Sequence, residues 1–103
     1  MDSGTPILFE WDENKSLENI RKHGIAFEDV TSIFDDEYRV ELFDSYHSTQ
    51  AELRYIVIGF VSDILYVVYT ERVNRIRIIS ARIATAEERK LYYDCAKIIR
   101  EEN

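Results

Sequence analysis

Apolar and polar residues follow a helical period in the first third of the chain, after a short apolar strand over residues 7–11. Asp12 can cap a helix over residues 13–22, and Gly24 stands where a left-handed residue commonly ends one. The buried edge of this helix is expected to consist of two apolar residues, Leu17 and Ile20. The chain before the strand is expected to start irregularly, over residues 1–5.

A second run of apolar residues at helical spacing predicts a helix over residues 27–34. Four apolar side chains would face the core from it, namely Phe27, Val30, Ile33 and Phe34. The start of this helix is weakly capped, because Ala26 stands where serine or threonine would accept a backbone hydrogen bond.

Four strands are predicted to follow. Residues 38–43 alternate between polar and apolar, which is typical of a half-exposed edge strand. Residues 53–61 and 64–70 are apolar on both faces, as central strands are. Residues 75–82 form the fourth strand, and the short connections make the last three strands an antiparallel meander.

A final helix is predicted over residues 86–100, opened by Thr85 and Glu88 at the spacing of a capping box. Its apolar stripe consists of Leu91, Tyr92, Cys95, Ile98 and Ile99. The elements together predict an α+β fold in one domain over residues 1–103. In that fold an antiparallel β-sheet has two N-terminal helices against one face and a C-terminal helix nearby.

The composition is that of a globular domain, with 46% hydrophobic residues among 103. The only cysteine, Cys95, lies on the apolar stripe and is expected in the core. A single cysteine excludes an internal disulfide and suits a reducing compartment. No apolar run approaches the length of a membrane span, and the N-terminus lacks a signal pattern, so a cytoplasmic location is expected.

The net charge of −7 is unevenly distributed along the chain. Between Glu28 and Glu52, eight acidic residues stand against Arg39 alone, and this segment accounts for the whole excess. Segregated charge predicts two faces with different roles. An acidic face would attract a basic partner, and an arginine-bearing face would bind phosphate.

Four arginines lie in and around the last predicted strand. Arg75 and Arg77 share a strand face, Arg72 precedes the strand and Arg82 ends it. Guanidinium groups match phosphate oxygens in pairs, which indicates a phosphate or RNA backbone as ligand. Alternatively, the arginines pair with carboxylates of the chain itself. Because Arg77 and Arg82 are five residues apart, they face opposite ways unless the strand ends or bulges near Ala81.

Several motifs occur in order along the chain. They are Phe-Glu-Trp-Asp-Glu-Asn-Lys at residues 9–15, Asn19 with Lys-His-Gly at residues 22–24, Phe27 with Phe-Asp at residues 34–35, and Arg-Ile-Arg-Ile-Ile-Ser-Ala-Arg at residues 75–82 followed by Ala84 and Glu88-Arg89. In this order and spacing, the sequence resembles the BrnT family of type II toxins over residues 8–93.

The resemblance implies a RelE-like fold and a metal-independent ribonuclease that blocks translation. It also implies a BrnA-type antitoxin, with a DNA-binding ribbon-helix-helix, that neutralises the toxin. Neither a cofactor nor a metal is expected. A non-catalytic binding module of the same fold, acting in a repressor or partner complex, is the alternative function.

The arginines of the best-matched motif, Arg77 and Arg82, are the favoured catalytic residues. RNA cleavage without a metal proceeds by attack of the 2′-hydroxyl on the adjacent phosphorus, and arginines can position the phosphate and stabilise its added charge. Arg72 and Arg75 are expected to guide the RNA backbone or to pair with Glu71.

The remaining candidates are less clearly separated from structural roles. His23 is the favoured general base because histidine titrates near neutral pH, although a cation there also complements the helix dipole. Lys22 is a candidate phosphate contact. Arg54 begins a buried strand and shares its face with two isoleucines, so it either contacts substrate or forms a structural ion pair. His47, in a polar loop, is expected to be solvated.

Overall fold

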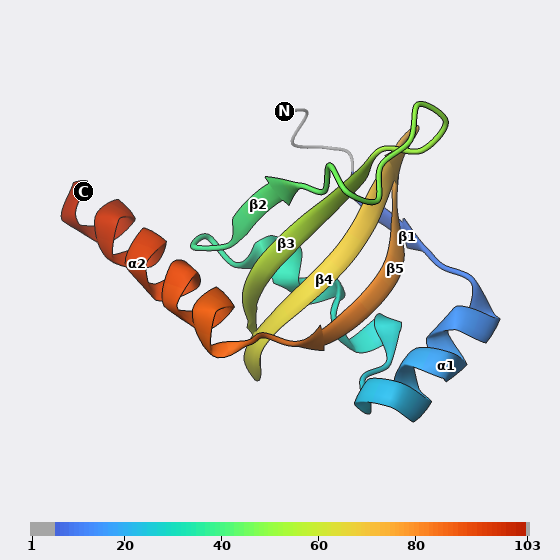
Figure 1. The fold of residues 1–103 in the computed structure, drawn as a ribbon, viewed down its shortest axis with the longest axis horizontal. Coiled ribbons are helices and arrows are strands. Elements are labelled where there is room, and N and C mark those ends of the chain that lie inside the picture. The colour runs from blue at the N-terminus through green and yellow to red at the C-terminus, as the bar shows by residue number, and fades with distance from the viewer. Residues whose placement is uncertain (1–5, 103) are drawn as a thin grey trace.

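The computed structural model describes residues 6–102; the irregular start expected over residues 1–5 lies outside them. Within these residues the chain forms a five-stranded sheet in the order β1-β5-β4-β3-β2 (Figure 1). The strands are β1 (Leu8–Glu10), β2 (Val40–Phe43), β3 (Arg54–Val61), β4 (Asp63–Arg72) and β5 (Arg75–Ile83). The edge position of β2 and the meander of β3, β4 and β5 are confirmed.

The prediction of an all-antiparallel sheet was wrong, because β1 runs parallel to β5. The other neighbouring pairs are antiparallel, so the sheet is mixed. The strands β1 and β5 are separated by most of the chain, and no hairpin signal fixes their relative direction. The apolar pattern of a three-residue strand contains no information on this point.

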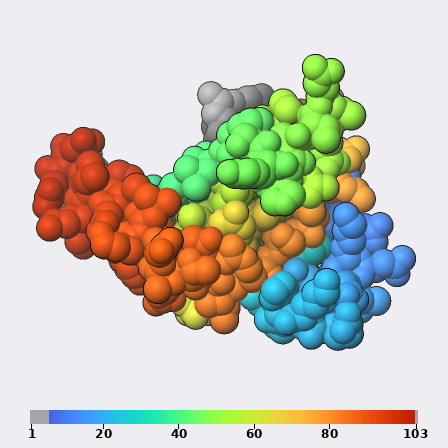
Figure 2. Space-filling view, in the orientation of Figure 1, coloured from blue at the N-terminus to red at the C-terminus, as the bar shows by residue number. Residues whose placement is uncertain are grey.

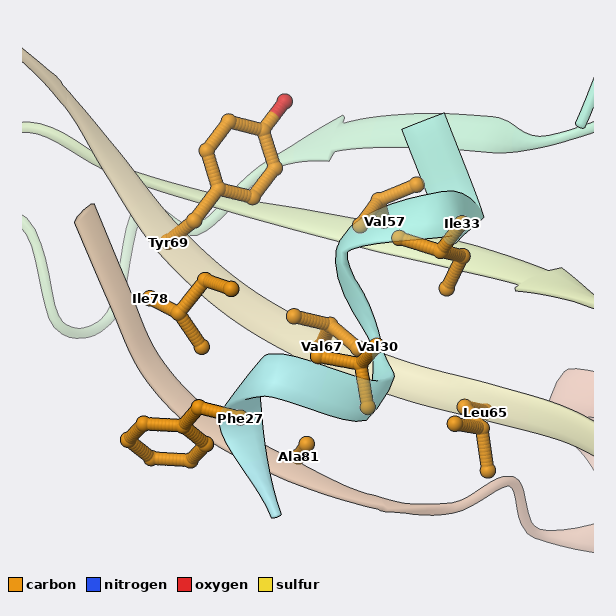
Figure 3. Packing of buried hydrophobic residues seen from close by; sticks show 9 residues of the cluster. All are labelled: Phe27, Val30, Ile33, Val57, Leu65, Val67, Tyr69, Ile78 and Ala81. Carbon is orange, nitrogen blue, oxygen red and sulfur yellow. The ribbon is translucent and has the colours of Figure 1, made fainter. Parts of the chain in front are cut away.

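The segment predicted as one helix over residues 27–34 forms two 3₁₀ helices instead, η1 (Phe27–Asp29) and η2 (Thr31–Asp35). Ala26 provides no side-chain cap, and β-branched residues crowd the turns that an α-helix would need. The predicted core residues Phe27, Val30 and Ile33 are nevertheless completely buried. They pack on one face of β3, β4 and β5, here called the core face (Figure 3).

The first helix, α1 (Glu13–His23), has the predicted ends. The Asp12 carboxylate accepts hydrogen bonds from the first turn, and Gly24 adopts a left-handed conformation with φ of 70°. The predicted buried edge was wrong, because Leu17 and Ile20 are 63% and 43% exposed. The buried residues of α1 are the polar Ser16 and Asn19.

Asn19 explains why α1 turns a polar side toward the sheet. Its Nδ2 donates to the carbonyl oxygen of Ala81 (2.9 Å), and its Oδ1 accepts from the Ala81 N–H (3.1 Å). β1 pairs with β5 only as far as Arg77, so the remaining edge of β5 would lack a partner. The amide of Asn19 takes the place of a neighbouring strand there.

The opposite face of the sheet carries a smaller apolar cluster of Ile56, Ile58, Ile64, Ala84 and Tyr92. Tyr92 comes from the last helix, α2 (Ala86–Glu102), whose predicted capping box is confirmed. Only the start of α2 contacts the sheet, and the rest extends away from it (Figure 1). The prediction of a buried stripe was therefore wrong: Tyr92 is buried, Leu91 and Ile98 are exposed, and Cys95 is only partly buried.

Asp36 connects the start of α2 to the sheet. Its carboxylate accepts hydrogen bonds from the Tyr92 hydroxyl (2.6 Å) and from the backbone N–H groups of Phe60 (2.8 Å) and Tyr38 (2.9 Å). Burial opposes ionisation, but these three donors hold the pKa of Asp36 below its ordinary value of 3.8. The network stabilises the fold as long as Asp36 is ionised.

We expect Tyr92→Phe to lower the free energy of unfolding at pH 7 by about 1.5–3 kcal/mol, the usual contribution of a hydrogen bond to a charged group. Because the folded-state pKa of Asp36 is lowered, this contribution is present above about pH 3.8 and is lost as the pH falls through the folded-state pKa. Denaturant unfolding between pH 2.5 and 7 would measure it. Tyr93→Phe, at the exposed neighbouring residue, is the control. A difference that stays constant down to pH 2.5 would contradict the assignment to Asp36.

Candidate functional site

Strand β5 contains a bulge at Ile79, where its register with β4 shifts by one residue. Before the bulge Arg77 lies opposite Thr70, and after it Arg82 lies opposite Tyr66. Thr70 and Tyr66 are four residues apart in β4, so their side chains share a face, and the arginines opposite them share it as well. The bulge therefore brings together two arginines that a regular strand would separate.

Three more arginines lie on the same face. Arg54 of β3 is opposite Thr70 on its other side, so Arg54, Thr70 and Arg77 form a row across three strands. Arg72 and Arg75 are opposite each other at the end of the β4–β5 hairpin. The face carrying Arg54, Arg72, Arg75, Arg77 and Arg82 is here called the arginine face. It is turned away from η1 and η2, toward the viewer in Figure 1.

Glu10, in the neighbouring strand β1, pairs with two of these arginines. Its Oε2 atom lies 2.8 Å from Nη1 of Arg77, and its Oε1 atom lies 3.7 Å from Nε of Arg75. Glu10 is the register partner of Arg77, so the parallel pairing of β1 with β5 creates this bridge. The sequence suggested Glu71 as the partner of Arg75, and the structure places Glu10 there instead.

Glu52, in the loop before β3, pairs with two more arginines. Nε of Arg54 lies 3.0 Å from Oε1 of Glu52, and Nη2 of Arg72 lies 3.5 Å from Oε2. Arg72 therefore also has a partner other than Glu71. As predicted, Arg54 begins β3 and its side chain lies on the same face of the strand as that of Ile56.

Arg82 is held most firmly of the five. Its Nη1 and Nη2 atoms donate to the two carboxylate oxygens of Glu88 at 2.8 and 3.0 Å. Its guanidinium carbon lies 3.9 Å from the centre of the Tyr66 ring. These hydrogen bonds lower the pKa of Glu88 and raise the pKa of Arg82, because they stabilise the charged form of each group. Glu88 also accepts from the Thr85 N–H, so the capping box of α2 fixes the arginine.

The five arginines thus share three glutamates, and two positive charges remain on this set. The alternative prediction, that the arginines pair with carboxylates of the chain itself, is confirmed for all five. Such pairing fixes the position of a guanidinium group without using all of its five N–H donors. The free donors and the surplus charge can still bind an anion.

Lys22 and His23 lie elsewhere, at the end of α1. Lys22 is exposed and 3.5 Å from Glu18, and the ring of His23 is exposed to solvent. The adjacent Gly24 lines a cavity of about 500 Å³ together with Leu65, whose side chain belongs to the core face. Within residues 6–102, no hydrogen bond or ion pair joins Lys22 or His23 to the arginine face. The structure does not bring these two candidates together with the arginines.

The second histidine, His47, was not predicted to be a candidate. His47 is exposed, as expected, but its Nδ1 atom lies 2.9 Å from Oδ2 of Asp44, which is only 7% exposed. Asp44 in turn is bonded through its N–H to the carbonyl oxygen of Arg54. The sequence did contain a signal for this pair, because Asp44 directly follows a strand and stands three residues before His47.

The part of the chain that the structure describes shows no group of three or more His, Cys, Asp or Glu residues placed to hold a metal ion. In the same part, none of the helices has the length and apolar character needed to cross a membrane.

Comparison with protein families matches residues 11–88 to the ribonuclease toxin BrnT of type II toxin–antitoxin systems. The chain belongs to this family. The structure is similar to the crystal structure of the Brucella abortus ribonuclease toxin BrnT, with a TM-score of 0.60 and 27% sequence identity. The similarity covers 78% of this chain and 99% of that one. Comparison with curated proteins gives no match.

The BrnT match contains all five residues of the arginine face, together with Glu52 and Glu88. It ends at Glu88, within the first turn of α2, so most of that helix lies beyond it. Glu10 lies just before its start. Membership of the BrnT family identifies the chain as a ribonuclease toxin of a toxin–antitoxin system, with RNA as target and an antitoxin as partner.

Proposed function

We propose that this chain cleaves RNA without a metal ion and that the arginine face is its active site. The observation that supports the proposal most is the set of five arginines on one sheet face, which Arg82 joins because of the bulge at Ile79 and which three glutamates hold in place. Preorganised guanidinium groups can stabilise the charge that develops on a reacting phosphate, as a metal ion would.

In the proposed reaction the 2′-hydroxyl oxygen attacks the adjacent phosphorus. The bond from O2′ to phosphorus forms and the bond from phosphorus to O5′ breaks, which leaves a 2′,3′-cyclic phosphate and a 5′-hydroxyl. Arg77 and Arg82 contact the reacting phosphate, and Arg54 lies in the same row as Arg77. Arg72 and Arg75, at the hairpin end of the face, bind the RNA backbone beside it.

The glutamates have a positioning role in this proposal. An arginine that is free in solution samples many rotamers, whereas Arg77 and Arg82 are each held at 2.8 Å by a carboxylate. Holding the guanidinium groups before substrate arrives removes their reorganisation from the barrier. The phosphate approaches the N–H donors that the carboxylates leave free.

The proposed antitoxin is a BrnA-type protein with a ribbon-helix-helix domain, as the resemblance implies, and the fold is proposed to be RelE-like. The acidic residues between Glu28 and Glu52 lie on η1, η2, the turn after η2, the edge strand β2 and the loop after it. Glu52 pairs with two arginines of the arginine face, so the predicted separation of charge into two faces is incomplete. A basic partner would be attracted to the acidic residues of η1, η2 and β2. A non-catalytic binding module is the second candidate function, favoured by the fact that all five arginines already have carboxylate partners.

Metal-independent cleavage is tested by incubating the purified protein with RNA in excess EDTA. We expect cleavage to continue at an unchanged rate, because arginine side chains provide the positive charge, and to leave cyclic phosphate or 3′-phosphate ends. Denaturing gels and end-group analysis would follow it. Cleavage that stops with EDTA and returns with magnesium would refute metal independence. Soluble protein that neither cleaves RNA nor slows growth when expressed alone would favour the binding module.

A further inference from the structure

His47 and Asp44 form a hydrogen-bonded pair in the loop that follows β2. The Asp44 carboxylate accepts from Nδ1 of His47 at 2.9 Å and from its backbone N–H at 3.3 Å. Asp44 is 7% exposed, whereas the His47 ring is open to solvent. A buried carboxylate thus holds one side of an imidazole whose other side is free.

This pair belongs to the arginine face. Leu42 of β2 is opposite Ile56, whose side chain lies on that face. The hydrogen bond from the Asp44 N–H to the Arg54 carbonyl oxygen (2.9 Å) extends the pairing of β2 with β3 by two residues. Asp44, two residues after Leu42, therefore points to the same side of the sheet. Burial raises the pKa of Tyr66, and the nearby charges of Glu88 and Asp44 add to this rise. The loop lies over the upper part of this face in Figure 2.

The hydrogen bond fixes the state of the imidazole. An ionised carboxylate accepts hydrogen bonds and has no proton to donate, so Nδ1 of neutral His47 carries the hydrogen and Nε2 carries the lone pair. Among residues 6–102, Nε2 has no hydrogen-bond partner. An exposed Nε2 lone pair, oriented by an aspartate, is the arrangement of a general base.

We propose that His47 is the general base of RNA cleavage and that Asp44 is its positioning residue. The proposal rests on the proposed ribonuclease function. Nε2 takes the proton of the 2′-hydroxyl as O2′ bonds to phosphorus, and the leaving O5′ receives a proton from water. Asp44 stabilises the imidazolium that results, while the arginines stabilise the charge on phosphate.

His23 is the competing base, and the structure favours His47 over it. Within the described residues His23 has no carboxylate partner to orient its ring, and no hydrogen bond or ion pair joins it to the arginine face. The second alternative is that Asp44 and His47 only shape the loop. In that case the ring would contribute to stability and not to the rate of cleavage.

The test is His47→Ala in an RNA cleavage assay with and without added imidazole. We expect the rate to fall about 100-fold or more, the usual contribution of general base catalysis, and imidazole to restore part of it. The melting temperature should fall only modestly, because the Asp44 carboxylate keeps the hydrogen bond from the backbone N–H of residue 47. Tyr46→Ala, at a neighbouring residue that is 94% exposed, is the matched control and should cleave at the parental rate.

The positioning role of Asp44 has its own readout. Asp44→Asn alone should slow cleavage, because an amide favours the wrong tautomer of His47. In the His47→Ala background, Asp44→Asn should slow it no further, since Asp44 acts through the ring. A further loss in the double variant would show that Asp44 only supports the loop.

Three outcomes would overturn the proposal. If His47→Ala cleaves RNA at the parental rate, His47 is not the base and the ribonuclease function stands. If His23→Ala loses the activity and His47→Ala does not, the base lies at the end of α1. If the parental protein itself does not cleave RNA, the ribonuclease function fails and the proposal fails with it.

Discussion

Arg77→Ala and Arg82→Ala are each expected to reduce the rate of RNA cleavage about 100-fold or more. Both guanidinium groups lie on the arginine face with their positions fixed by glutamates. Removing one preorganised donor to the reacting phosphate costs about 2.7–4 kcal/mol of transition-state stabilisation in comparable sites. The loss should appear mainly in kcat, because the contact strengthens as charge develops on phosphate. Single-turnover cleavage of a defined RNA would measure it.

The two variants should differ in stability. Arg82→Ala removes the bidentate pair with Glu88 and the contact with Tyr66, so its melting temperature should fall. Arg77→Ala removes one contact with Glu10, which keeps Arg75 as a partner, so its melting temperature should change less.

The control for the arginine variants is Arg21→Ala. Arg21 also pairs with a glutamate, Glu18, but it is exposed on α1, away from the arginine face. It should cleave RNA at the parental rate. If both arginine-face variants cleave at that rate as well, the arginine face is not the active site. If both variants lose activity only because they unfold, their role is structural.

The features that were predicted correctly are encoded by residues close together in the chain. Asp12 and Gly24 end α1 as expected because a cap needs only one turn of backbone. Thr85 and Glu88 open α2 for the same reason. The five arginines could be named as candidates because their residue type alone suggests phosphate binding.

The features that were missed depend on contacts between distant segments. The direction of β1 is fixed by pairing with β5, and the partners Glu10 and Glu52 follow from where β1 and the loop after β2 are placed. A bulge near Ala81 was one of the alternatives left open by the sequence, and the pairing with β4 places it at Ile79, where it decides which arginines share a face. Leu17 was assigned to the core by its apolarity, but the polar Asn19 occupies that side of α1.

Asn19→Ala is expected to be among the most destabilising single substitutions in the chain. Its amide makes three hydrogen bonds: Nδ2 donates to the carbonyl oxygens of Ile25 (2.8 Å) and Ala81 (2.9 Å), and Oδ1 accepts from the Ala81 N–H (3.1 Å). Ala81 is completely buried, so water cannot easily replace the lost partner. Each stranded backbone group costs about 1–3 kcal/mol.

The expected loss is therefore about 3 kcal/mol or more, which corresponds to a fall in melting temperature of roughly 12–24 °C for a domain of this size. Thermal unfolding followed by circular dichroism would measure it. Asn14→Ala is the control: Asn14 is exposed in the first turn of the same helix, and its replacement should change the melting temperature by only a few degrees.

Asn19→Asp separates shape from hydrogen bonding at this position. The aspartate is nearly isosteric and can still accept from the Ala81 N–H, but it cannot donate to the two carbonyl oxygens, and its charge would be buried. We expect it to be at least as destabilising as alanine at pH 7. If both variants melt within a few degrees of the parental protein, the edge of β5 does not depend on Asn19, and α1 must be held to the sheet by its apolar neighbours Trp11 and Ile25.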